Sequence, residues 1–428
     1  NKKKNSQTKK NEIFNITKQL LDKNIQISNI QKNLLIKNQN INDLIDPLSI
    51  TFKRTLSGKK LKNIKNSTLA KYKTNQILFT ANFKALGSAY IDLFTNSKII
   101  LATYDGIFSI ADLNNIEYFK KIKTNIRDII KYENFYLHDN YGIKDILVDG
   151  DDLYVSYIGE EYKNCHNLEI IQSKINYNYL QFKKIYKTPN CISQKNDYGE
   201  FLAQQGAGGR LYKASDNSLF LTTGEFRFRT LSQDDTSVYG KIIEINLKNN
   251  KIKIISKGHR NPQGLYYSNK SNFIISTEHG PKGGDEINII KDPKNKVTNF
   301  GWPISSYGEH YYKNYSNDKL KNAPLNKSHQ KYGFEEPIKY FVPSIGISEI
   351  VAINDDETEF LIGAMGSEIA EKDLSIHYIK LNRERTKIID HKFEILNERV
   401  RDIVFSKELN KAYLFLETTS SLGVINFN

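Results

Sequence analysis

The feature that most constrains the fold is a recurring pair of short apolar stretches joined by a polar turn. Clear cases are KDILVDGDDLYVSYIGE, GLYYSNKSNFIISTE and RDIVFSKELNKAYLFLET. Alternating and β-branched apolar residues favour strands, and the Gly, Asn and Asp residues between them favour tight turns. The hairpin recurs about six times after residue 76, and no helical pattern alternates with it. This pattern predicts an all-β protein and favours a β-propeller over a large sandwich or barrel.

The chain before these hairpins has a different periodicity. Over residues 13–45 apolar side chains recur at the a and d spacing of a heptad, at Ile13, Ile16, Leu20, Ile27, Ile30, Leu34, Ile41 and Leu44. Lys23 and Lys37 interrupt the pattern, and Pro47 ends it. We therefore predict a helical or amphipathic arm over residues 1–75, which is either a stalk or packed on the main domain. The propeller is predicted to span residues 76–428.

The charge of the chain narrows the choice of partners. The net charge is +14, but the Lys residues are spread evenly along the sequence. It contains no arginine-rich helix, zinc-finger spacing or aromatic RNA-binding signature, so we predict no nucleic-acid partner. The hydrophobic fraction of 39% is that of a globular protein. Association with anionic surfaces stays open.

The cysteines indicate a compartment. Cys165 and Cys191 are the only two, and they flank a segment that reads as a hairpin, so we predict a disulfide between them. Two free thiols are the alternative. A disulfide favours an oxidising compartment, and we expect a periplasmic or otherwise extracytoplasmic protein. No apolar run is long enough to span a membrane, and membrane anchoring through a leader that precedes Asn1 stays open.

Residues that can carry chemistry gather in KGHRNPQGLYYSNKSNFIISTEHGPKGGDEIN, residues 257–288. GHRNPQ enters one hairpin and HGPKGGDEIN leaves it, and in a propeller the loops at one face surround the central channel. The motifs GHRNPQGL, TEHGPKGGDEIN and TNFGWPISSYG strongly resemble those of the PQQ-dependent sugar dehydrogenases, also called glucose/sorbosone dehydrogenases. GGRLYKASDNSLFLTTGE, GKIIEIN, YFVPSIGISEI and ERVRDIVF extend the resemblance, in order, over roughly residues 135–425.

The resemblance implies a six-bladed propeller with PQQ in a central pocket beside Ca²⁺. It places Arg260 and Asn261 at the quinone carbonyls and Arg399 and Arg401 at the PQQ carboxylates, with Arg210 as a further cofactor-binding candidate. Guanidinium groups pair with carboxylates in a directional, bidentate way, and six of only ten arginines lie in these motifs or directly after one of them. Salt bridges between blades are an equal alternative for three of them, Arg210, Arg227 and Arg229.

Two calcium sites are also implied by the resemblance. The backbone carbonyls of Gly280 and Pro281 occupy the positions that ligate the PQQ-bound ion, and a hard cation prefers such oxygen ligands. Asp285 and Glu286, together with the carbonyl of Phe300, resemble a second, structural site. For the acidic pair a solvated turn is the alternative.

Two positions depart from the family pattern. The family's catalytic His lies four residues before Arg210, and this chain has Gly206 there. Glucose-specific members carry a Lys where this chain has Gly366. His279 is the candidate substitute base, with a supporting hydrogen-bond role as the alternative. Trp302, the single tryptophan, is predicted to pack rather than to react.

These motifs lead to two hypotheses about function. The first is a PQQ- and Ca²⁺-dependent oxidoreductase that uses Arg260 and His279 to oxidise the C1 hydroxyl of an aldose-type sugar or another small polyol. Hydride passes to the quinone, and the sequence does not indicate the final electron acceptor. The alternative is a non-catalytic propeller of the same family that acts as a periplasmic or surface binding module. Three tyrosines of the segment 305–337 could stack on a sugar or simply pack, namely Tyr307, Tyr311 and Tyr312.

Overall fold

The computed structural model describes residues 48–76, 78, 85–130, 142–196, 206–311, 315–366 and 373–427. In these ranges strands dominate, and the prediction of an all-β protein is confirmed. The helical elements there are short: α2 (Ile126–Ile129), η2 (Arg229–Ser232), α3 (Asn317–Asn322) and η3 (Gln330–Tyr332). The heptad-like segment 13–45 lies outside the described residues.

Most strands form antiparallel meanders in which each strand pairs with the next along the chain. One consists of β3 (Ala89–Phe94), β4 (Lys98–Thr103), β5 (Phe108–Asp112) and β6 (Asn115–Thr124). The next consists of β7 (Ile143–Asp149), β8 (Asp152–Tyr162), β9 (Cys165–Lys174) and β11 (Lys183–Lys187). Two short strands add to these sheets, β10 (Tyr179–Leu180) on β6 and β12 (Ile192–Ser193) on β9.

Three further meanders follow the same plan. The first comprises β13 (Gly208–Ser215), β14 (Ser218–Thr223), β15 (Lys241–Asn246) and β16 (Ile252–Lys257), with the short β20 (Thr298–Asn299) parallel to β16. The second comprises β17 (Pro262–Ser268), β18 (Phe273–Glu278), β19 (Asp285–Lys291) and β21 (Lys339–Phe341). The third comprises β22 (Ile347–Ala352), β23 (Glu359–Ala364), β24 (Ser375–Leu381) and β25 (Ile388–Ile395).

The two ends of the described chain meet in one sheet. The C-terminal strands are β26 (Val400–Ser406), β27 (Lys411–Leu416) and β28 (Ser421–Asn426), and the N-terminal β2 (Ser67–Thr74) pairs with β28. β1 (Ser49–Leu61) pairs with β2 and also with β6. Residues 49–61 and 67–74 are therefore strands, and the predicted boundary of the arm at residue 75 is wrong. β1 was missed because most of its side chains are exposed and polar.

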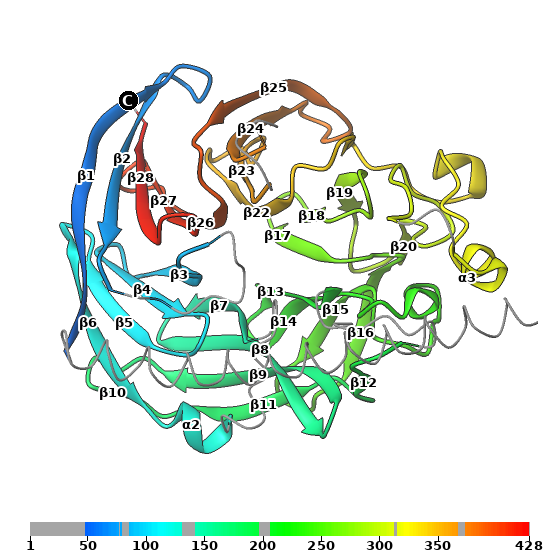
Figure 1. Ribbon diagram of the computed structural model, residues 1–428, viewed down its shortest axis with the longest axis horizontal. Coiled ribbons are helices and arrows are strands. Elements are labelled where there is room, and N and C mark those ends of the chain that lie inside the picture. The colour runs from blue at the N-terminus through cyan, green and yellow to red at the C-terminus, as the bar shows by residue number, and fades with distance from the viewer. Residues whose placement is uncertain are drawn as a thin grey trace, which may run out of the picture.

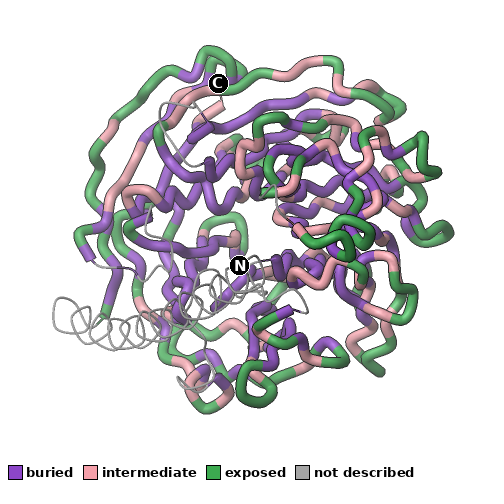
Figure 2. Tube along the Cα trace, turned by 45° about the vertical axis from the view of Figure 1, so that its right-hand side comes forward, coloured by how far each residue is buried: buried purple, intermediate pink, exposed green. Residues whose placement is uncertain are grey.

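The innermost strands of the meanders form a closed ring. β3, β7, β13, β17, β22 and β26 contact one another in this order, and β26 contacts β3. Figure 1 shows these strands around the centre, with β6, β11, β16 and β25 at the rim. Apolar side chains fill the space between neighbouring meanders. The buried residues accordingly lie in the inner parts of the sheets (Figure 2).

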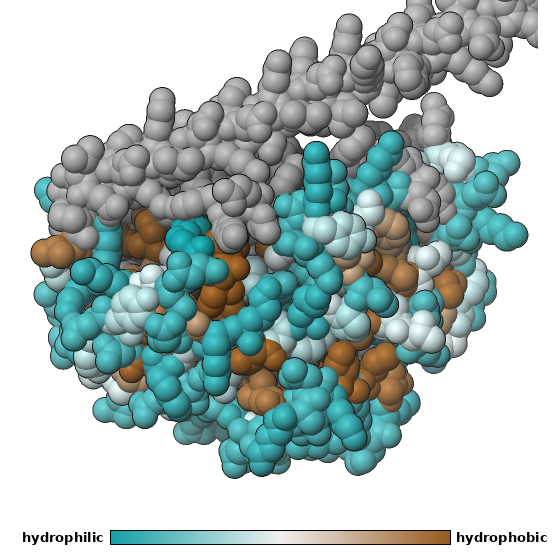
Figure 3. All heavy atoms as spheres, turned by 90° about the horizontal axis from the view of Figure 1, so that it is seen from below, coloured by the Kyte–Doolittle hydropathy of each residue, from teal (hydrophilic) through white to brown (hydrophobic). Residues whose placement is uncertain are grey.

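Most hydrophobic side chains lie inside the protein rather than on its surface. The face shown in Figure 3 is largely hydrophilic, with hydrophobic side chains in small groups. Among the described residues, no helix has the length and apolar composition needed to cross a bilayer.

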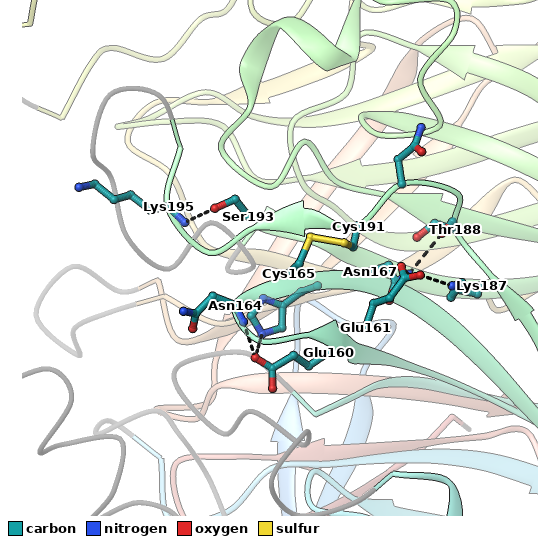
Figure 4. Close-up of a disulfide and its surroundings, with 12 residues drawn as sticks. Glu160, Glu161, Asn164, Cys165, Asn167, Lys187, Thr188, Cys191, Ser193 and Lys195 are labelled. Carbon is teal, nitrogen blue, oxygen red and sulfur yellow. Dashed lines mark hydrogen bonds and ion pairs between the residues drawn. A yellow bond between two sulfur atoms is a disulfide. The ribbon is translucent and has the colours of Figure 1, made fainter.

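The predicted disulfide between Cys165 and Cys191 is confirmed (Figure 4). Cys165 begins β9, and β12 pairs antiparallel with that end of the strand. The segment between the cysteines thus runs out along β9 and returns through β11, which brings the two Cα atoms to 5.3 Å. The covalent bond links the start of β9 to the residue before β12.

Removing the disulfide should lower the stability of the whole domain. The cysteines are 26 residues apart, and closing a loop of that size removes chain entropy from the unfolded state. A Cys165→Ser/Cys191→Ser variant should lose about 3–4 kcal/mol of unfolding free energy in urea. Reducing agent should have the same effect on the wild type and none on the variant; equal stability of the two oxidised proteins would contradict the prediction.

Candidate active site

A cavity of about 420 Å³ opens at the end of the ring where the inner strands begin. This volume is within the range of cofactor pockets. Its walls come mainly from the loops that enter β13, β17 and β22, from the loop that follows β14, and from the loop between β18 and β19. The lining residues are Gly206, Glu225, Arg227, Arg260, Asn261, His279, Gly280, Pro281, Lys282, Gly283, Asp285, Tyr311, Pro343, Ser344 and Gly346. Six predicted site residues are therefore brought together: Arg260, Asn261, His279, Gly280, Pro281 and Asp285.

Arg260 is held in a fixed position in the lining. Its Nη1 donates to the carbonyl of His279 at 3.0 Å, and its backbone N–H donates to the Glu278 carboxylate at 2.8 Å. The guanidinium carbon lies 5.6 Å from the centre of the Trp302 ring, a cation–π contact. Trp302 is buried against Ala323 and Leu325. Trp302 therefore packs, as predicted, and it also supports Arg260.

Asn261 joins two loops of the cavity wall. Its Oδ1 accepts from the backbone N–H of Gly208 at 3.1 Å and from Nε2 of Gln263 at 2.8 Å. Its backbone carbonyl accepts from the N–H of His279 at 3.1 Å. The side-chain oxygen is thus committed to holding the entry of β13 against the entry of β17.

His279 presents a neutral imidazole to the site. Its Nε2 is buried and has no hydrogen-bond partner among the described residues. Burial lowers the pKa of His279, and the positive charges of Arg260 and Arg401 lower it further, against the opposing effect of Asp285. A ring in this environment is unprotonated near neutral pH, but the two arginines also disfavour the imidazolium that proton transfer would create.

The turn that starts at Gly280 is fixed by Asp285. The Asp285 carboxylate accepts from the backbone N–H groups of Gly280, Ile345 and Ile347 at 3.0–3.1 Å. A Cβ at Gly280 would lie 2.1 Å from the carbonyl oxygen of Gly284, so the turn requires glycine there. In the described part of the chain nothing donates to the carbonyl of Gly280 or Pro281. Two uncommitted carbonyl groups beside a cavity fit a hard cation.

The second calcium site suggested by the resemblance does not fit. Asp285 and Glu286 are neighbours on β19, so their side chains point to opposite faces of the sheet. On the Glu286 side an imidazole already lies between the proposed ligands. The Nδ1 atom of His329 is 2.7 Å from the Phe300 carbonyl, and its Nε2 atom is 3.2 Å from Oε1 of Glu286. A ring that bridges both oxygen groups leaves no place for an ion between them.

The predicted arginine pair lies beyond the cavity lining. Arg399 and Arg401 donate through their Nε atoms to the two oxygens of Glu417, at 3.1 and 2.6 Å. Glu417 is fully buried, which raises its pKa, but Arg401 and Arg399 outweigh burial and bring that pKa to about 2. Arg399 also donates to the carbonyl of Gly366, the residue that replaces the Lys of glucose-specific members.

Arg210 is a structural residue rather than part of the cavity. Its Nη1 lies 2.9 Å from Asp145, 2.7 Å from Glu349 and 2.7 Å from Asp402, and its Nη2 donates to the carbonyl of Arg401. These acids are the one cluster in the described ranges with metal-ligand spacing, and the guanidinium already occupies its centre. The alternative considered from the sequence, salt bridges between blades, is the observed arrangement.

Several lining residues were missed by the sequence reasoning. Glu225 follows β14 within the motif GGRLYKASDNSLFLTTGE, and its position beside the cavity depends on contacts between distant loops. Of the tyrosines, Tyr311 lines the cavity, whereas Tyr307 stacks on Tyr340 with ring centres 3.7 Å apart. Tyr312 lies outside the described residues.

Comparison with known proteins gives the family. Residues 111–424 match the glucose/sorbosone dehydrogenase family. The chain belongs to the glucose/sorbosone dehydrogenase family. It is 31% identical over 260 residues to the aldose sugar dehydrogenase YliI of Escherichia coli, a match that covers 56% of this chain. The match spans 62% of that relative, less than two thirds of its length.

Solved structures of related proteins share the β-propeller fold. The apo form of the soluble aldose sugar dehydrogenase from Escherichia coli has a TM-score of 0.62 at 20% identity, over 80% of this chain and 96% of the other. A PQQ-bound aldose sugar dehydrogenase from Streptomyces coelicolor has a TM-score of 0.56 at 16% identity, over 84% and 98%. At these identities the likeness concerns the fold alone.

Loss of Arg210 should destabilise this family member strongly. Without its guanidinium, three buried carboxylates from β7, β22 and β26 would face one another uncompensated. Breaking a buried ion pair in this way costs about 3–5 kcal/mol. We expect a loss of that size for Arg210→Met in urea denaturation and almost none for Arg383→Met in the exposed β24–β25 turn. A loss below about 1 kcal/mol for Arg210→Met would contradict the role assigned to it.

His329 should make stability depend on pH. Burial lowers its pKa, but Glu286 and the Phe300 carbonyl outweigh burial and raise it above the usual value. The resulting stabilisation is complete below the unfolded pKa of about 6.5 and is lost as pH rises through the folded pKa. His329→Gln should therefore cost more at pH 6, about 1.5–3 kcal/mol, than at pH 8. His391→Gln is the control with the opposite sign, because burial lowers the pKa of His391 to about 4.

Proposed function

We propose that this protein is a PQQ-dependent oxidoreductase that oxidises the C1 hydroxyl of an aldose-type sugar. The observation that carries the proposal is the pairing of a fixed guanidinium, Arg260, with the rigid Gly280-Pro281 turn in one cavity. Such an arrangement offers directional donors and uncommitted carbonyl oxygens, which an anionic quinone and its divalent cation require together. Membership of the glucose/sorbosone dehydrogenase family supports the proposal.

Each part of the cavity has a role in this proposal. Arg260 would hold the quinone side of PQQ, and the Gly280 and Pro281 carbonyls would ligate Ca²⁺. When bound, PQQ supplies the two-electron oxidant that no amino-acid side chain provides. His279 is the base expected from the sequence, and Tyr311 at the cavity wall suits a sugar or small polyol ring. Arg399 and Arg401 would contribute positive potential from behind the lining rather than contacts.

The proposal extends to architecture and location. The family resemblance implies six blades, and the ring of inner strands β3, β7, β13, β17, β22 and β26 supports this number. The Cys165–Cys191 disulfide supports an extracytoplasmic, for example periplasmic, location, since such bonds persist in oxidising compartments.

A second function is favoured by one specific observation. Gly206 takes the place of the family's catalytic His, and a glycine cannot accept a proton. The protein would then be a non-catalytic binding module with the same cavity. The two functions differ in whether a bound quinone is reduced when sugar is added.

Binding of PQQ tests the cavity before any turnover is measured. Titrating the protein with PQQ in the presence of Ca²⁺ should give a saturable change in the visible absorbance of the quinone. Arg260→Lys should weaken binding about tenfold or more, because an ammonium loses the planar, directional donors of guanidinium. Arg383→Lys, which changes an exposed arginine remote from the cavity, should bind as the wild type does. Absence of PQQ binding by the wild type would refute the oxidoreductase proposal.

A further inference from the structure

The structure shows what borders the position of the missing His. Gly206 lines the cavity, and a Cβ placed on it would lie 3.6 Å from Oε1 of Glu225. The next neighbours of that point are the backbone nitrogens of Phe226 and Arg227, at 3.7 and 3.9 Å. These are ordinary contact distances, so a side chain could begin at residue 206 without a clash. The space that such a side chain would enter is bordered by the Glu225 carboxylate.

Glu225 is held rigidly at this place. Its side chain is buried, and the residue lies two positions after Thr223, the last residue of β14. The backbone N–H of Glu225 donates to the carbonyl of Arg260 at 2.9 Å, and its carbonyl accepts from Phe228 at 2.8 Å. The N–H of Phe226 donates to the carbonyl of Gly206 at 3.1 Å. The backbone of Glu225 and Phe226 is thus bonded both to Arg260 and to Gly206.

Three groups of the lining can take up a proton, namely Glu225, His279 and Asp285. The Asp285 carboxylate already accepts three backbone N–H groups, and Glu225 has the side-chain atom nearest to a Cβ at residue 206. Proton transfer to a carboxylate creates a neutral group, which a buried, water-poor position favours. The carboxylate also borders the space in which a side chain at residue 206 would act.

We propose that Glu225 is the proton acceptor of the reaction, in place of the side chain that Gly206 lacks. The inference rests on the proposed function. The O–H bond of the sugar C1 hydroxyl breaks, and its proton goes to the Glu225 carboxylate. The electron pair of the C1–H bond leaves as hydride to the quinone oxidant, and the carbon–oxygen bond becomes a carbonyl. His279, whose carbonyl receives Arg260, then acts as a positioning residue.

The first test is independent of turnover and uses the protein without cofactor. Gly206→His places an imidazole next to Glu225, and its ring proton can be identified by NMR as the histidine signal absent from the wild type. The pKa of this imidazole should be raised above about 6.5, because an adjacent carboxylate stabilises the imidazolium. The shift should vanish in the Gly206→His/Glu225→Gln double variant. An imidazole with the same pKa in both variants would overturn the proposed placement of the carboxylate.

The second test measures reduction of bound PQQ by D-glucose, D-galactose and D-xylose in single turnovers. Glu225→Gln should bind PQQ as the wild type does but reduce it about 10²–10⁴-fold more slowly. Glu225→Asp should recover part of the rate, and Glu384→Gln, in the exposed β24–β25 turn, should keep all of it. Wild-type rates in Glu225→Gln, with loss of rate in His279→Gln, would overturn this inference and leave the proposed function standing. If the wild type binds no PQQ, or binds it and none of the sugars reduces it, both fall.

Discussion

The buried interaction of Arg210 with three carboxylates determines how the inner strands meet. Asp145, Glu349 and Asp402 come from β7, β22 and β26, and each approaches the same guanidinium from β13. The acids also accept backbone N–H groups across strand boundaries, Asp145 from Leu211 and Asp402 from Ile91. One cation therefore fixes strands that are far apart in sequence. The loops that enter β13 and β22 line the cavity, so its shape depends on this centre.

This arrangement separates two uses of arginine that the sequence alone could not distinguish. Arg210 pairs with three acids within the ring, and Arg399 and Arg401 share the single carboxylate of Glu417, so the side chains of all three are held by protein carboxylates. Arg260 instead makes a cation–π contact with Trp302 and donates to the backbone carbonyl of His279. Among the described residues, no carboxylate pairs with its side chain. An anionic ligand would therefore find a stronger directional partner at Arg260 than at Arg210, Arg399 or Arg401, because these three already hold protein carboxylates.

The sequence could predict those features whose interacting residues are close together along the chain. Strand pairs with Asn-rich turns and the disulfide around a returning hairpin are local patterns, and both are present. The residues of 257–288 reach one cavity because the two loops flank a single hairpin. β1 and β2 escaped prediction because most side chains of β1 are exposed and polar, and because the strands that join this pair to the sheets, β6 and β28, are distant in sequence. The second calcium site failed for the same reason, since His329 comes from a remote loop to bridge Glu286 and Phe300.

The same reasoning explains why a missing histidine does not by itself decide against catalysis. A motif compares residues at one position, whereas proton transfer requires only an acceptor at one place in space. At Gly206 the backbone approaches Glu225, and the loop after β14 carries that carboxylate to the cavity beside Arg260. Loss of a side chain on one loop can therefore be compensated by a residue on its neighbour. For this chain, the identity of the acceptor depends on the contact between these loops rather than on either motif alone.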